Sequence, residues 1–136
     1  MANLSTQTNK NVKTDIQNRQ DIDHLMRHFY QYLLADSRIN YLFTNIAQVN
    51  LEEHFPVLCD FWEGILFQSG TYKRNAMQPH LDLHKKSELT TQHFSIWLAY
   101  FNQSINELFV GEKANYAKER ALSIATVMQI KIASNA

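Results

Sequence analysis

The amino-acid sequence predicts an all-α fold, and three observations carry that prediction. Only three glycines and two prolines interrupt the 136 residues, so few residues in the chain end helices. Apolar side chains recur at steps of three and four residues over several long stretches, which is the period of helices with one buried face. Hydrophobic residues make up 45% of the chain, which is enough for one domain with its own core.

Charge and cysteine content exclude several classes of protein. Lysine and arginine together number 13, as do aspartate and glutamate, so no charge excess attracts nucleic acid. The single cysteine, Cys59, excludes an internal disulfide and suits a reducing compartment. The N-terminal residues lack the apolar run of a signal peptide, and no segment reaches the roughly 20 apolar residues of a membrane span. These features predict a cytoplasmic protein with no nucleic-acid or membrane partner.

The first predicted helix spans residues 21–35. It follows a polar N-terminal tail at 1–19, which we expect to be flexible, and it opens a single domain at 20–136. Tyr30 borders the apolar stripe of this helix, and a buried phenol needs a hydrogen-bond partner. The stripe itself consists of Ile22, Leu25, Met26, Phe29 and Leu33.

The second predicted helix spans residues 50–67. It follows a mixed connection in which Phe43 offers a flat ring for stacking. The apolar face of the helix includes His54, but Pro56 follows closely and leaves open where that imidazole points. Gly70 is expected to stop the helix.

His80 is the most informative single residue of the chain. It directly follows Pro79 and is flanked by Leu81 and Leu83, in what we expect to be a very short apolar turn after a loop at 71–79. A neutral imidazole walled by aliphatic side chains suits a single bond to a metal or to haem iron. Taken alone, the same pattern also fits a histidine that caps a loop beside a helix.

Two further helices are predicted, at 90–109 and at 112–132, with Gly111 between them. Trp97 is central on the apolar stripe of the first of these, and its indole N–H needs an acceptor if it is buried. His93 lies off this stripe and is expected to be exposed.

Four polar side chains are expected to converge. Tyr30, His54 and Trp97 come from three helices, and His80 comes from a linking segment. Such a set makes sense around a flat apolar ligand with a metal at its centre, bound by His80 on one side. The other three would line the opposite side, where donors stabilise the negative charge that oxygen acquires on ferrous iron. Water would be excluded by Phe43, Leu58 and Leu81.

Five blocks of sequence resemble the third group of the bacterial truncated haemoglobins, and the resemblance as a whole covers about residues 20–132. The chain also lacks the paired glycines at helix corners that are typical of the first two groups. The blocks are 26–30 (MRHFY), 42–45 (LFTN), 53–54 with 61–66 (EH and FWEGIL), 80–83 (HLDL) and 94–98 (FSIWL).

The resemblance implies a two-over-two helical sandwich around haem b. His80 matches the proximal iron ligand, although His84 lies one turn further on and could compete for the iron. Tyr30 and Trp97 match the distal hydrogen-bond donors, and His54 matches the distal histidine. Arg74 could meet an acidic group such as a haem propionate. The full set of predicted cofactor contacts is Phe43, His54, Leu58, Phe61, Trp62, Tyr72, Arg74, His80, Leu83 and Trp97.

The function expected from this set is the binding of oxygen, nitric oxide, carbon monoxide or similar small ligands at haem iron. Several donors around a bound ligand should slow its release, which suits nitric oxide dioxygenase or peroxidase-like chemistry better than bulk transport. Turnover would need an external reductase, and a monomer or weak dimer is expected. The alternatives are a non-haem metal site, formed by His80 and His84 with Asp82 or His54, and a cofactor-free helical interaction module.

Overall fold

The computed structural model describes residues 12–68 and 77–134, and within these ranges the predicted all-α class is confirmed. Extended pairing there consists of an isolated bridge between Thr14 and Phe109. None of the described helices is both long enough and apolar enough to cross a membrane. The elements are α2 (Arg19–Ala35), one turn of π-helix η1 (Leu42–Ile46), α3 (Leu51–Phe67), α4 (Met77–Lys86), α5 (Thr91–Leu108) and α6 (Glu112–Ser134).

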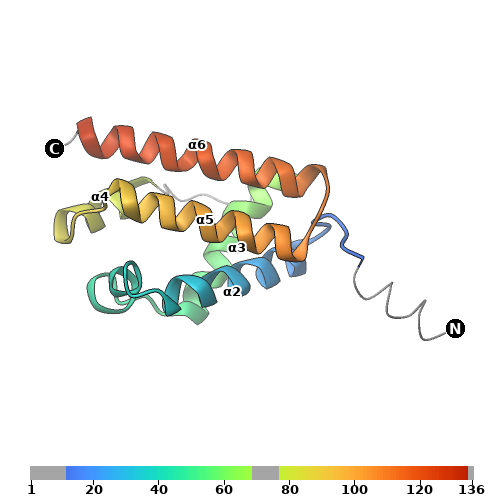
Figure 1. Cartoon of the computed structure of the whole chain (residues 1–136), viewed down its shortest axis with the longest axis horizontal. Helices are drawn as coiled ribbons and strands as arrows, with labels where there is room; N and C mark the ends of the chain where they lie inside the picture. Colours follow the sequence, from blue (N-terminus) through green and yellow to red (C-terminus); the bar gives the residue numbers. More distant parts are fainter. Residues whose placement is uncertain (1–11, 69–76, 135–136) are drawn as a thin grey trace, which may run out of the picture.

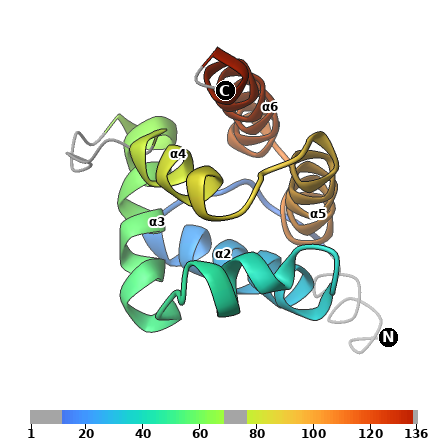
Figure 2. The ribbon, with the colours of Figure 1, turned by 90° about the vertical axis from the view of Figure 1, so that its left-hand side faces the viewer.

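The helices pack as two pairs, α2 with α3 and α5 with α6, and α2 also packs against α5. The α5 and α6 helices run side by side along the long axis of the molecule, with α2 on the other side of α5 (Figure 1). Viewed from its end, the molecule has α4 between α3 and α5, above α2 (Figure 2). This arrangement is the two-over-two sandwich that the sequence predicts.

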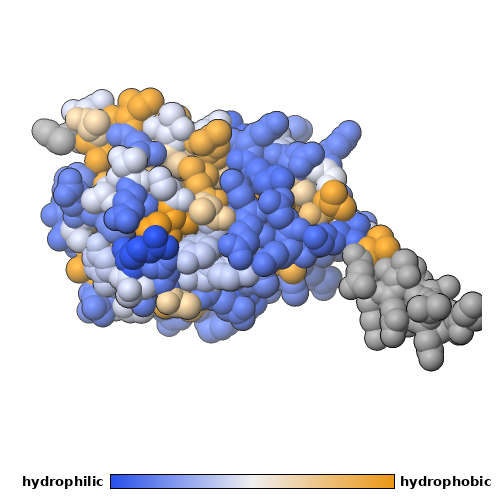
Figure 3. Space-filling view, viewed as in Figure 1, coloured by the Kyte–Doolittle hydropathy of each residue, from blue (hydrophilic) through white to orange (hydrophobic). Residues whose placement is uncertain are grey.

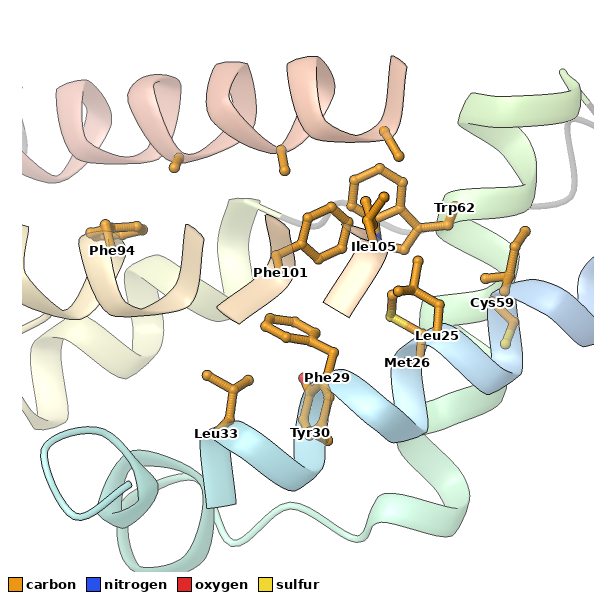
Figure 4. Packing of buried hydrophobic residues seen from close by; sticks show 14 of the residues in the cluster. Leu25, Met26, Phe29, Tyr30, Leu33, Cys59, Trp62, Phe94, Phe101 and Ile105 are labelled. Atoms are coloured by element: carbon orange, nitrogen blue, oxygen red, sulfur yellow. The ribbon is translucent and has the colours of Figure 1, made fainter. Parts of the chain in front are cut away.

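The core forms where the apolar stripes of α2 and α5 meet. Phe29 of α2 packs edge-on against Phe101 of α5, with ring centroids 5.2 Å apart, and both side chains are fully buried. Trp62 of α3 stacks on the other side of Phe101 at 5.0 Å, so three helices share one aromatic cluster (Figure 4). Burying a large aromatic side chain contributes roughly 1.5–3 kcal/mol, so this cluster accounts for much of the contact between the pairs.

The outer face of α6 retains apolar side chains. Hydrophobic atoms are visible along the edge of the molecule where the C-terminal half of α6 lies (Figure 3). Along α6 the side chains of Leu122, Val127 and Ile130 are about half exposed. The inner face is built from small residues, and Ala117, Ala121 and Ala125 let α6 approach its neighbours closely.

Residues 12–18, which lie inside the predicted flexible tail, are extended and packed against the α5–α6 corner. Ile16 is buried in the core, and Asp15 accepts hydrogen bonds from the backbone N–H groups of Lys113 and Ala114, both at 2.9 Å. Asp15 therefore satisfies the first turn of α6, whose N–H groups have no partner within the helix. Gly111 approaches so closely that a Cβ there would lie 2.4 Å from Asp15 Cγ.

One predicted element was wrong, and one predicted helix stop is not tested. The segment after Pro79 is the ten-residue helix α4 and not a very short turn. Pro79 lies in its first turn, where the missing N–H is not needed, and Lys85 and Lys86 suit its negative C-terminal end. The α3 helix ends at Phe67, because Gln68 takes a left-handed φ of 55°. Gly70, the predicted stop, lies outside the described residues.

Candidate functional site

A mainly apolar cavity of about 240 Å³ lies between the helices and receives side chains from α2 to α6. This volume is near the lower end of the ~300–1,000 Å³ usual for small-molecule pockets. Among its lining residues are all the predicted site residues that the structure describes: Tyr30, Phe43, His54, Leu58, Phe61, Trp62, His80, Leu83 and Trp97. Tyr72 and Arg74 lie outside the described residues. Leu81, predicted to exclude water, packs against the core but does not line the cavity.

Tyr30 and His54 form a polar pair on the cavity wall. The Tyr30 hydroxyl and His54 Nε2 are 2.9 Å apart, within hydrogen-bond distance. Burial raises the pKa of the Tyr30 phenol, so the hydroxyl keeps its proton. Burial, and to a smaller extent the charge of His80, lower the pKa of His54, which favours the neutral imidazole. The pair therefore offers neutral O–H and N–H groups to the cavity.

The question that Pro56 raised about His54 has a structural answer. The α3 helix runs unbroken from Leu51 to Phe67 with Pro56 inside it. The backbone N–H of His54 donates to the Asn50 carbonyl at 2.9 Å, so the turn that carries the imidazole is intact. Pro56 has no N–H to donate to the Glu52 carbonyl, so one bond is missing from the turn around His54, but the helix continues past it. The imidazole points inward, with Nε2 2.9 Å from the Tyr30 hydroxyl.

Trp97 contributes an indole ring, with its N–H donor, to the cavity wall. Its indole stacks on Phe101, with centroids 5.5 Å apart and planes 9° apart, and meets Phe29 edge-on at 5.7 Å. These contacts hold the ring at the cavity wall. A donor placed in this way is available to a molecule inside the cavity.

His80 reaches the same cavity from α4. It is half-buried and lines the cavity together with His54. His84, one turn further on, does not line the cavity, and its Nδ1 accepts the backbone N–H of Leu89 at 3.0 Å. Of these two imidazoles, His80 is therefore the one that faces the cavity.

His93 is the polar residue that the sequence reasoning misjudged. It was expected to be exposed, but it is only 8% exposed and lines the cavity. Its Nδ1 accepts the backbone N–H of Thr90 at 3.1 Å, so a neutral ring carries its proton on Nε2 and donates to the Tyr41 hydroxyl at 2.9 Å. The Thr-x-x-His spacing of a capping box at the start of α5 was the available signal.

The chemistry of these groups fits a haem. One imidazole, from His80, faces a cavity whose walls are otherwise largely aliphatic and aromatic. A neutral Tyr–His pair and an indole N–H supply donors at the same cavity. By contrast, the described residues contain no group of three or more His, Cys, Asp or Glu side chains that could hold a metal ion by themselves. One protein ligand with an apolar surround is the pattern that a planar metal cofactor requires.

Comparison with known proteins agrees with this geometry. No protein-family model matches the chain. The group 3 truncated hemoglobin ctb of Campylobacter jejuni is 31% identical over 121 residues, which cover 87% of this chain and 93% of that protein. A crystal structure of the group III truncated hemoglobin from Campylobacter jejuni aligns with a TM-score of 0.79 at 28% identity, over 89% of this chain and 95% of the other. Similarity in sequence and fold over nearly the whole of both chains shows that this protein belongs to the group 3 truncated haemoglobins.

Proposed function

We propose that the chain holds haem b in this cavity and binds oxygen and other diatomic ligands at the haem iron. One observation carries the proposal: His80 shares an apolar cavity with the donors Tyr30, His54 and Trp97. Membership of the group 3 truncated haemoglobins supports a globin-type role. When bound, haem would supply an iron centre that His80 could hold and that could bind a small molecule.

Each lining residue has a separate task in this proposal. His80 would hold the iron through its imidazole. Phe43, Leu58 and Phe61, with their neighbours, would enclose the macrocycle and exclude water, which slows oxidation of ferrous iron. The apolar lining favours an uncharged flat surface, because a buried polar group without a partner costs ~1–3 kcal/mol.

Tyr30 can donate a hydrogen bond to a ligand while it keeps its hydrogen bond with His54. If His54 carries its proton on Nε2, that N–H donates to the Tyr30 oxygen, and the Tyr30 hydroxyl is free to donate into the cavity. Trp97 adds an indole N–H at the same cavity. Two neutral donors at one cavity would stabilise a ligand that carries partial negative charge, as in an oxyanion hole.

This donor set supports slow release of oxygen. Slow release suits a reaction in which bound oxygen or peroxide is consumed, such as nitric oxide dioxygenation or peroxidase-like turnover, better than oxygen delivery. In this proposal the electrons for turnover would come from an external reductase.

The test is reconstitution of the purified protein with haemin, followed by visible spectra before and after dithionite and carbon monoxide. We expect a haem Soret band that shifts on reduction and again with carbon monoxide. His80→Gly should lose stable haem binding, whereas His84→Gly, a matched change one turn away, should retain it. A protein that takes up no haem, or that loses haem only in the His84 variant, would overturn the proposal. Elemental analysis for zinc and iron separates a non-haem metal site.

A further inference from the structure

Two tyrosines stack face to face at the α2–α5 surface, outside the cavity. The rings of Tyr32 and Tyr100 have centroids 5.2 Å apart and planes only 2° apart, and both side chains are half-buried. Each phenol donates to a carboxylate: Tyr32 to both oxygens of Glu107, at 2.7 and 2.9 Å, and Tyr100 to Asp36 at 2.7 Å. Both hydroxyl protons therefore already lie on a hydrogen bond to a base.

The two carboxylates differ in how readily they can take a proton. Asp36 is held by the guanidinium of Arg38 at 2.5 Å, a permanent cation, and the bond to Arg38 drives the pKa of Asp36 far below its usual range. Glu107 is instead held by His28, with Nε2 2.8 Å from Oε1, and its pKa is lowered to about 2, first by His28 and then by Tyr32. Asp36 is thus tied to a permanent cation whereas Glu107 is paired with an imidazole, so Glu107 is the carboxylate left to accept a proton.

The pair lies one helical turn from the cavity wall. Trp97 lines the cavity and meets Phe29 edge-on at 5.7 Å. Tyr100 follows Trp97 by three residues on α5, and Tyr32 follows Phe29 by three residues on α2. Side chains three residues apart on a helix have Cβ atoms about 5–6 Å apart. Two aromatic pairs, one at the cavity and one at the surface, thus lie on consecutive turns of the two helices that pack side by side in Figure 1.

We propose that the stacked Tyr32–Tyr100 pair is a redox-active site that passes single electrons from an external phenol- or ascorbate-class donor to the cofactor cavity. This inference rests on the proposed haem function and names hydrogen peroxide as the oxidant. Stacking and carboxylate bonds would also occur in a purely structural contact. Two features distinguish this pair. Each phenol is hydrogen-bonded to a carboxylate, and the pair lies one helical turn from Trp97.

Electrons and protons balance in this step. The Tyr32 O–H bond breaks, its electron moves toward the cavity through the aromatic pair at Trp97, and its proton moves to the Glu107 carboxylate. The external donor then gives one hydrogen atom to the Tyr32 oxygen and leaves as a radical, while Glu107 releases its proton to water. Two such rounds supply the two electrons that reduce one peroxide to two waters. Tyr100 stacks on the ring that becomes electron-poor.

The first experiment uses the haem-free protein and a photogenerated ruthenium(III) tris-bipyridine oxidant. Radicals are followed by electron paramagnetic resonance and located by mass spectrometry of nitroso spin-trap adducts. We expect the adduct on Tyr32 and the loss of most of the tyrosyl signal in Tyr32→Phe and in Glu107→Gln, which removes the base but keeps the size. Tyr116→Phe is the matched control, because Tyr116 on α6 is 45% exposed and would dominate if exposure alone decided. Adducts mainly on Tyr116, with an unchanged signal in Tyr32→Phe, would overturn the inference.

The second experiment repeats these measurements on haem-loaded protein treated with hydrogen peroxide. The same dependence on Tyr32 and Glu107 is expected. If haem is taken up but the radical forms on another residue, the proposed electron transfer through Tyr32 is refuted and the proposed haem function is retained. If no haem is taken up, the haem function and the route into the cavity both fail, and the haem-free experiment still decides whether the pair is redox-active.

Discussion

Tyr30→Phe is the most informative single substitution in the cavity. It removes one oxygen atom and keeps the ring, which packs edge-on against Phe43 and Phe55 with centroids about 5.4 and 5.5 Å away. Tyr30 is 5% exposed, so no water replaces the lost hydroxyl from outside. The bond to His54 at 2.9 Å is lost, and any bond to a ligand is lost with it.

The two losses have different magnitudes. A neutral hydrogen bond contributes roughly 0.5–1.5 kcal/mol to stability, and a bond to a charged group roughly 1.5–3 kcal/mol. We therefore expect the haem-free protein to lose about 1 kcal/mol of stability. If the phenol donates to bound oxygen, which carries partial negative charge, oxygen should dissociate roughly 10- to 100-fold faster, since each 1.4 kcal/mol corresponds to a factor of ten.

The assay is stopped-flow measurement of oxygen dissociation from the reduced, haem-loaded protein, with carbon monoxide as the displacing ligand. Carbon monoxide carries little charge when bound, so its own dissociation should change much less than that of oxygen. Tyr41→Phe is the control, because Tyr41 bonds His93 and does not line the cavity. An unchanged oxygen off-rate in Tyr30→Phe would refute the donor role, whatever happens to stability.

Three further predictions concern stability and can be checked by thermal or urea unfolding. Gly111→Ala should lower the melting temperature, because the new Cβ would lie 2.4 Å from Asp15 Cγ at a φ of 149°; a neutral result would mean that the segment around Asp15 moves freely. Asp15→Asn should cost about 0.5–2 kcal/mol, the value of a helix cap. Burial raises the pKa of Asp15, but its three backbone N–H bonds outweigh burial and lower the pKa overall. The contribution of Asp15 to the free energy of unfolding is therefore fully present above its unfolded pKa near 4 and is lost as the pH falls through its folded pKa. The stability of the Asp15→Asn variant should consequently change less with pH in that window. His93→Leu leaves the Thr90 N–H and the Tyr41 hydroxyl without their partner, and we expect a loss of about 1–3 kcal/mol, which equal stability in variant and parent would contradict.

Much of the fold could be predicted from the sequence because helices depend on contacts three and four residues apart. The period of the apolar residues located α2, α3, α5 and α6 to within a few residues. The same local signal failed at α4, where a short helix begins two residues before a proline and has no buried residue. It also failed at His93, whose burial depends on Tyr41, 52 residues away.

The sequence by itself determined the helical class, the apolar faces and, through its five blocks, the family and the candidate residues Tyr30, His54, His80 and Trp97. Only the tertiary structure decided that His54 points inward to Tyr30 despite Pro56, that His80 and not His84 faces the cavity, and that Trp97 lines the same cavity. The physical reason is the separation along the chain between the residues that interact. A helix is specified by neighbours within one turn, whereas a cavity and its hydrogen bonds depend on how whole helices pack across tens of residues of chain.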